Sequence, residues 1–152
     1  MTDPIVLTVT REIAAPPERV FDAWLDPATA RHFLFATPDG AMERCDIDAR
    51  VGGRALITER RPQGLAEHHL QYEEIDRPRR LVFLFRACLA GVGGEEGQWT
   101  RVSMEIAAID AGSRITLTHQ MDAEWADYEE QTRHGWTMIL DSLAHVMEND
   151  DG

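Results

Sequence analysis

His119 is the residue of this sequence whose position most suggests chemistry. It alternates with Ile115, Leu117 and Met121, which predicts a strand with one apolar face that carries an imidazole. An imidazole buried on such a face needs a hydrogen-bond partner. A polar group of a ligand could be that partner, but a bond to the protein itself is more common. We therefore predict a structural role first and a ligand contact second.

Glu59 is the candidate for a catalytic carboxylate, because it shares a predicted strand face with Ala55 and Ile57. No serine or cysteine stands in a nucleophile motif such as GxSxG. All 15 basic residues are arginine, so lysine chemistry such as a Schiff base is excluded. The sequence therefore assigns no catalytic residue. An enzyme that uses a cavity for hydrolysis or cyclisation is the third of three hypotheses.

The sequence predicts no metal, cofactor, nucleic acid or membrane as a partner. The six histidines show neither HxH nor HExxH spacing, and His68 and His69 point to opposite faces of a strand. The glycines between Gly91 and Gly97 join two predicted strands, whereas a phosphate-binding loop leads into a helix. The formal net charge of -12 opposes binding to nucleic acid or to an anionic membrane surface.

The composition, 43% hydrophobic and 28% charged residues, indicates a single globular domain over residues 1-152. Apolar runs such as Leu81 to Phe85 are far shorter than the roughly 20 residues of a membrane span. No signal-peptide pattern opens the sequence, so a cytoplasmic location is the default expectation. Cys45 and Cys88 are too distant in sequence for a redox or zinc pair and are expected as buried free thiols.

A long helix is predicted from Asp127 to Asn149. Asp127 and Glu130 form a capping box at its start, and early carboxylates suit the positive end of the helix dipole. Its apolar residues fall at steps of three and four, which places them on one stripe: Trp136, Ile139, Leu140, Leu143, Ala144 and Met147. The stripe must lie on an apolar partner, and the rest of the chain predicts a sheet.

Seven strands and two short helices precede the long helix. A strand at Ile5 to Ile13 leads into a helix that ends near Leu25 and a second helix from Ala28 to about Phe33. Alternation then starts at Met42, with Cys45, Ile47, Ala49 and Val51 on one face and a tight hairpin at Gly52-Gly53. The later strands are Arg54 to Arg60, His68 to Ile75, Leu81 to Ala87, Thr100 to Asp110 and Arg114 to Met121.

Four stretches in this order resemble the START-like superfamily, whose fold is called the helix grip, and within it the family named after the activator of the Hsp90 ATPase. The stretches are Arg11 to Phe33, Asp48 to Ile57, Asp76 to Phe85 and His134 to Glu148. The resemblance implies an α+β fold: a curved antiparallel sheet of about seven strands wrapped around a long C-terminal helix, with two short helices after the first strand. It also implies a hydrophobic cavity between sheet and helix, but no particular reaction.

The first hypothesis is the binding of a small hydrophobic or amphipathic molecule in that cavity. Trp136 and Phe83 are the strongest candidates, because the resemblance places them on opposite walls. The full set of predicted ligand contacts is Trp24, Phe33, Phe35, Phe83, Phe85, Met104, His119, Trp136 and Leu140. The second hypothesis, which the family name suggests, is a co-chaperone-like interaction domain that stimulates an Hsp90-type ATPase in the stress response.

Overall fold

The computed structural model describes residues 5–34, 40–62, 64–89, 99–121 and 129–149. The elements follow the chain as β1 (Ile5–Ile13), α1 (Pro17–Ala23), α2 (Pro27–Ala30), β2 (Ala41–Ile47), β3 (Arg54–Arg61), β4 (Gly64–Asp76), β5 (Arg80–Leu89), β6 (Thr100–Ile109), β7 (Gly112–Met121) and α3 (Glu129–Asn149). The predicted order of strands and helices is confirmed.

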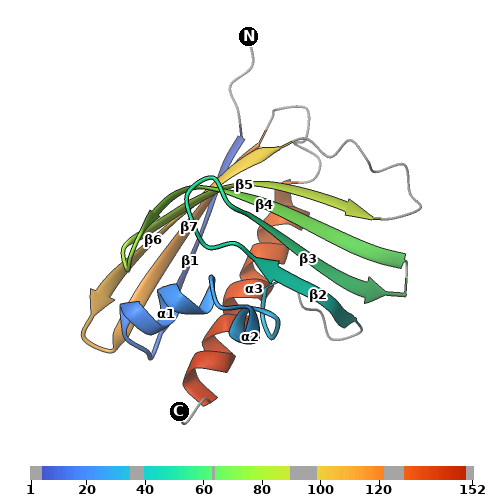
Figure 1. The fold of residues 1–152 in the computed structure, drawn as a ribbon. Coiled ribbons are helices and arrows are strands. Elements are labelled where there is room, and N and C mark those ends of the chain that lie inside the picture. Colours follow the sequence, from blue (N-terminus) through green and yellow to red (C-terminus); the bar gives the residue numbers. More distant parts are fainter. Residues whose placement is uncertain (1–4, 35–39, 63, 90–98, 122–128, 150–152) are drawn as a thin grey trace.

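The strands form one seven-stranded antiparallel sheet in the order β1-β7-β6-β5-β4-β3-β2. The sheet is open, with β1 and β2 at its two edges, and it curves around α3, which crosses its inner side (Figure 1). The predicted helix-grip architecture is therefore confirmed. The strands turn most of their apolar side chains toward α3. Strand twist, together with irregularities of register at Met42/Arg44 in β2 and Tyr72/Glu74 in β4, accounts for the curvature.

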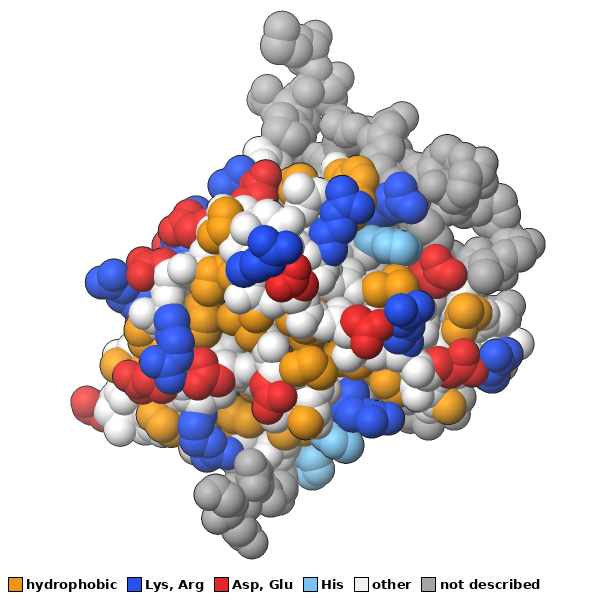
Figure 2. All heavy atoms as spheres, in the orientation of Figure 1, with side chains coloured by type: hydrophobic (Ala, Val, Ile, Leu, Met, Phe, Trp, Pro, Cys, Tyr) orange, Lys and Arg blue, Asp and Glu red, His pale blue; other side chains and the backbone are white. Residues whose placement is uncertain are grey.

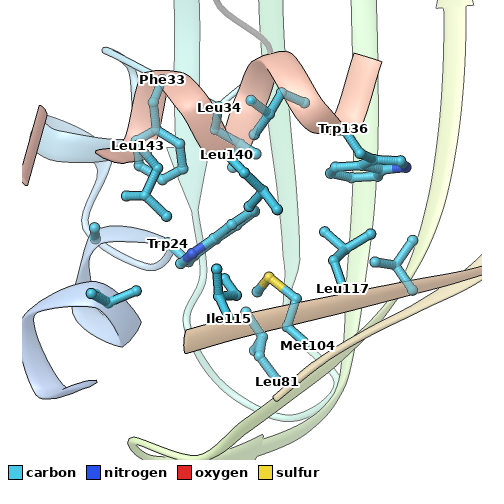
Figure 3. Packing of buried hydrophobic residues seen from close by; sticks show 14 of the residues in the cluster. Trp24, Phe33, Leu34, Leu81, Met104, Ile115, Leu117, Trp136, Leu140 and Leu143 are labelled. Atoms are coloured by element: carbon cyan, nitrogen blue, oxygen red, sulfur yellow. The ribbon is translucent and has the colours of Figure 1, made fainter. Parts of the chain in front are cut away.

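The apolar stripe of α3 lies against the sheet and the two short helices, as the spacing predicts. All six stripe residues are buried. In Figure 3 the side chain of Trp24, which follows α1, lies between Leu140 and Leu143 of α3 on one side and Ile115 and Met104 of the sheet on the other. Trp24 also packs edge-on against Phe33, with ring centroids 5.2 Å apart. This end of the fold is filled by side chains.

The loop after β2 differs from the predicted tight hairpin. β2 ends at Ile47 and β3 starts at Arg54, so the turn takes six residues, and Ala49 and Val51 are exposed instead of sharing the inner face. Gly52 has the expected positive φ of 85°. The loop is held by β4, since the N–H of Gly52 donates to the carbonyl of Tyr72 at 2.8 Å. A partner remote in sequence therefore decides its length.

Other element boundaries also differ from the predicted ones. α1 ends at Ala23 and α2 covers only Pro27–Ala30, with the Asp26 side chain capping the start of α2 by accepting from the N–H of Ala28 at 3.2 Å. β4 begins at Gly64, four residues before the predicted start. The predicted cap residue Asp127 lies outside the described residues, while Glu129 and Glu130 occupy the first turn of α3. The face of the molecule shown in Figure 2 mixes acidic, basic and hydrophobic side chains.

Alanine is expected to have opposite effects at two glycines. Gly112 has a φ of +143°, and a Cβ there would lie 2.3 Å from the carbonyl oxygen of Ile13. A Cβ on Gly135, inside α3, would meet nothing within 4 Å. Gly112→Ala should lower the free energy of unfolding by about 2 kcal/mol or more, whereas Gly135→Ala should raise it by about 1 kcal/mol. Urea unfolding measures both, and equal midpoints for the two variants would contradict this reading.

Candidate functional site

Five polar side chains share the inner face of the sheet near one end. Glu59 and Arg61 lie on β3, His68 on β4, Thr100 on β6 and His119 on β7. The strand register places them in neighbouring rows, since Ile57 pairs with His68, Leu70 with Phe85 and Phe85 with Thr100. The opposite end of the inner face, toward α1 and α2, is mainly apolar. The polar end is therefore the candidate functional site.

His119 is held by the protein on both ring nitrogens, which confirms the structural role predicted first. The indole N–H of Trp136 lies 2.9 Å from His119 Nδ1, and an indole can only donate. Nδ1 is therefore the acceptor, and Nε2 carries the proton and donates to Thr100 Oγ1 at 2.7 Å. The Thr100 hydroxyl in turn donates to the carbonyl of Phe85 at 3.2 Å. This chain of hydrogen bonds fixes one neutral tautomer of His119.

The neutral state of His119 links folding to pH. Burial lowers its pKa from 6.5 to about 4, and a second proton would place two N–H donors against each other at Trp136. Between about pH 4 and pH 6.5, the imidazole of His119 therefore binds a proton in the unfolded chain but not in the folded protein. The resulting stability is present above pH 6.5 and is lost as the pH falls toward 4.

Replacing His119 by glutamine should weaken this dependence on acid. Between pH 7 and pH 4.5 the wild type should lose roughly 2 kcal/mol more unfolding free energy than His119→Gln. Urea titrations at several pH values measure the difference, and the comparison cancels the carboxylates that both proteins share. If the unfolding free energies of the two proteins changed with pH in parallel, the pKa of His119 would be the same in the folded and the unfolded state.

Phe85 is the centre of an aromatic cluster at this end. Its ring centroid lies 5.7 Å from that of Trp136, 6.0 Å from His119 and 6.2 Å from His68, which it stacks on at 15°. His68 donates through Nδ1–H to the carbonyl of Ile57 at 3.2 Å. Burial, followed by the charge of Arg61, lowers the pKa of His68 to about 3. The cluster is thus a neutral aromatic wall that spans β4, β5, β7 and α3.

Glu59 is fully buried beside this wall, and Arg61 forms an ion pair with it. The distance from Arg61 Nε to Glu59 Oε1 is 2.6 Å, while the Arg61 side chain remains 27% exposed. Phe85 and Thr100 are also only partly buried. The guanidinium of Arg61 compensates the negative charge of Glu59, so we infer a structural role for this carboxylate. The polar end of the inner face therefore combines a buried charge pair with aromatic rings and partial access to solvent.

The family assignment follows from comparison of the chain with known families and structures. The family model described as activator of Hsp90 ATPase homolog 1-like protein matches residues 14–148. The chain belongs to this family. No curated protein matches it.

Solved structures agree with this assignment at the level of the fold. A crystallised protein of Chromobacterium violaceum is 23% identical with a TM-score of 0.81, and the alignment covers 97% of this chain and 100% of the other. An AHSA1-like protein of Aeromonas hydrophila, solved by NMR, is also 23% identical with a TM-score of 0.78, over 95% and 92% of the two chains. Family and fold support a ligand-binding domain in general terms and name no ligand.

The remaining predicted contacts of this AHSA1-like domain lie in its packed interior. Trp24, Phe33, Phe83, Met104 and Leu140 are all fully buried in the apolar core. Phe35 lies outside the described residues. Of the predicted set, the structure brings Phe85, His119 and Trp136 together at the polar end.

Sequence reasoning missed three polar members of this end, Arg61, His68 and Thr100. A signal for each was present, because the period of two places Arg61 on the face of Glu59, His68 on the face of Leu70 and Thr100 on the face of Val102.

Two buried donors were also not foreseen. Within the described part of the chain, the indole N–H of Trp24 and the hydroxyl of Tyr72 have no hydrogen-bond partner.

The described residues bear on the predictions of no metal and no membrane. Among them, no three His, Cys, Asp or Glu side chains form a group that could hold a metal ion. None of their helices combines the length and apolar composition that a membrane span requires. Cys45 is a free, half-buried thiol, and burial raises its pKa.

Proposed function

We propose that this AHSA1-like domain binds a small apolar or amphipathic molecule between the sheet and α3, entering at the polar end of the inner face. The observation that carries the proposal is the composition of that end. A neutral aromatic wall of Phe85, His119 and Trp136 stands beside the buried Glu59–Arg61 pair, and Arg61 and Phe85 are partly exposed. Apolar walls with a few placed polar groups are typical of small-molecule sites.

An amphipathic ligand would meet each part of this end with matching chemistry. Its apolar part would contact the rings of Phe85 and Trp136, and its polar end would lie near the partly exposed guanidinium of Arg61. No step of catalysis is proposed, since His119 and Glu59 are both engaged by the protein.

Native mass spectrometry of the purified protein tests whether a small molecule is bound. We expect an added mass that disappears when the protein is denatured. Titration with the neutral fluorophore 1-N-phenylnaphthylamine supplies a probe of known structure. Trp136→Phe should change its affinity roughly two- to tenfold, because one aromatic contact contributes about 0.5–1.5 kcal/mol.

The control for this experiment is Met138→Ala, since Met138 lies on α3 two residues after Trp136 and is 39% exposed. Its affinity for the fluorophore should equal that of the wild type. Unchanged affinity in a folded Trp136→Phe variant, checked by circular dichroism, would exclude the proposed position of the ligand.

The family description favours a second candidate, the stimulation of an Hsp90-type ATPase. Its support is the family match itself, and no described surface identifies a chaperone partner. An ATPase assay with a purified Hsp90-type chaperone and micromolar domain tests it directly. Stimulation would favour this candidate, and its absence in an assay with an active chaperone would remove it.

A further inference from the structure

A hollow of about 660 Å³ lies on the outer face of the sheet, away from α3. Three of its side chains stand in one row across neighbouring strands, because Leu56 of β3 pairs with His69 of β4 and His69 pairs with Arg86 of β5. Arg54 lies on the same face of β3, two residues before Leu56. Trp99, just before β6, borders the hollow. The polar end of the inner face is on the opposite side of the sheet, so the two sites are separate.

Two arginines of this hollow have no acidic partner among the described residues. Eleven of the protein's 15 arginines form ion pairs with described carboxylates. Arg54 and Arg86 form none with any carboxylate in the described part of the chain. The Nε–H of Arg86 is buried and has no hydrogen-bond partner there. Such a group is costly unless an acceptor is supplied, and the hollow offers room for one.

The acidic residues that line the hollow do not cancel this charge. Asp46 is bound by Arg44, and Asp48 accepts from Arg50 Nε at 2.8 Å. Two guanidinium groups therefore remain available on a protein whose formal net charge is -12. A local positive field on an acidic protein selects small anions that can approach closely, since larger acidic partners are repelled by the rest of the surface.

An aromatic surface adjoins the two charges. The guanidinium carbon of Arg86 lies 5.5 Å from the ring centroid of Trp99. The Trp99 side chain is 40% exposed, and Leu56 supplies a further apolar contact in the hollow. A planar ring could pack on these side chains while a charged group attached to it reached the arginines.

We propose that this outer hollow binds a small aromatic oxyanion. Its carboxylate or phosphate oxygens accept hydrogen bonds from Arg54 and Arg86, whose planar guanidinium groups match both geometries. Its ring packs against Trp99 and Leu56. The site is independent of the proposed inner ligand, which is apolar and lies on the other side of the sheet.

Indole N–H signals in ¹⁵N NMR spectra test the proposal with defined probes. Trp99→Phe identifies the Trp99 signal by its loss. Titration with 2-naphthoate and with phenyl phosphate should each shift that signal and saturate, and the stronger of the two distinguishes a carboxylate site from a phosphate site. The neutral amide 2-naphthamide has the same ring system without the charge and should bind at least about tenfold more weakly.

Arginine variants separate the site from general attraction of anions. Arg86→Gln and Arg54→Gln should each weaken binding of the preferred anion about tenfold. Arg114→Gln removes an exposed arginine of β7 whose partner is Glu12; neither residue lines the hollow, so the affinity should stay unchanged. The proposal is overturned if neither probe saturates by about 10 mM, if all three variants lose affinity equally, or if the anions shift the Trp136 signal instead of that of Trp99. A fluorophore result at the inner site leaves this test unaffected.

Discussion

Replacing Arg61 by methionine is expected to lower the free energy of unfolding by about 3 kcal/mol. Glu59 is fully buried, and Arg61 Nε lies 2.6 Å from its Oε1. Methionine keeps much of the arginine stem but leaves the Glu59 carboxylate without this cation. Breaking a buried pair is costly because the remaining charge keeps its desolvation penalty and loses its compensation. Urea unfolding at pH 7 measures the loss.

The double variant Glu59→Met with Arg61→Met is the decisive control. It removes both charges, so no carboxylate is left buried, and most of the lost stability should return. Arg60 directly precedes Arg61 on β3 and lies on the exposed outer face. Arg60→Met should lower the free energy of unfolding by less than about 1 kcal/mol, since the ion pair of Arg60 with Glu43 is solvent-exposed. If Arg61→Met and Arg60→Met cost the same, the buried pair does not carry the stability assigned to it.

Leu140→Ala is expected to cost about 3 kcal/mol of unfolding free energy. Leu140 is fully buried on the stripe of α3, in the cluster that includes Trp24 and Leu143. Truncation removes apolar contacts and leaves a cavity that packed neighbours fill only in part. The midpoint of urea unfolding, with an unchanged slope, reports the loss.

Met138→Ala is the matched control on the same helix. Met138 is 39% exposed, so its truncation should change stability by less than about 0.5 kcal/mol. A Leu140→Ala variant that is no less stable than Met138→Ala would mean that α3 does not pack on the sheet as described. The two variants also show whether the apolar stripe, and not helix propensity, holds α3 in place.

Most of the fold could be predicted because its elements have strong periods. The stripe of α3 recurs every three to four residues, and Ile115, Leu117 and His119 alternate on β7, so their faces follow from local geometry alone. Boundaries were less predictable. The loop at Gly52 is bonded to Tyr72 of β4, and no local pattern in Gly52-Gly53 contains that partner.

The candidate site was predictable only in part, because its contacts also join residues that are remote in sequence. Sequence placed His119 on an apolar face and indicated that the protein would satisfy its ring, but it did not name the partners. The two partners, Trp136 and Thr100, are 17 and 19 residues away in sequence, on α3 and β6. The sequence separations between His119 and these partners follow neither the strand period nor the helix period. The contacts depend instead on how the sheet curves around α3.

Within the regular strands and α3, the sequence by itself determined which side chains face inward, because the periods of strand and helix fix the direction of each side chain along its own element. It also determined the family, through stretches spread over most of the chain. Only the tertiary structure decided which inward residues meet. Curvature of the sheet gathers Glu59, Arg61, His68 and His119 at one end, and on the outer face it sets Arg86 beside Trp99. Contacts between elements depend on packing in three dimensions, which local periodicity does not encode.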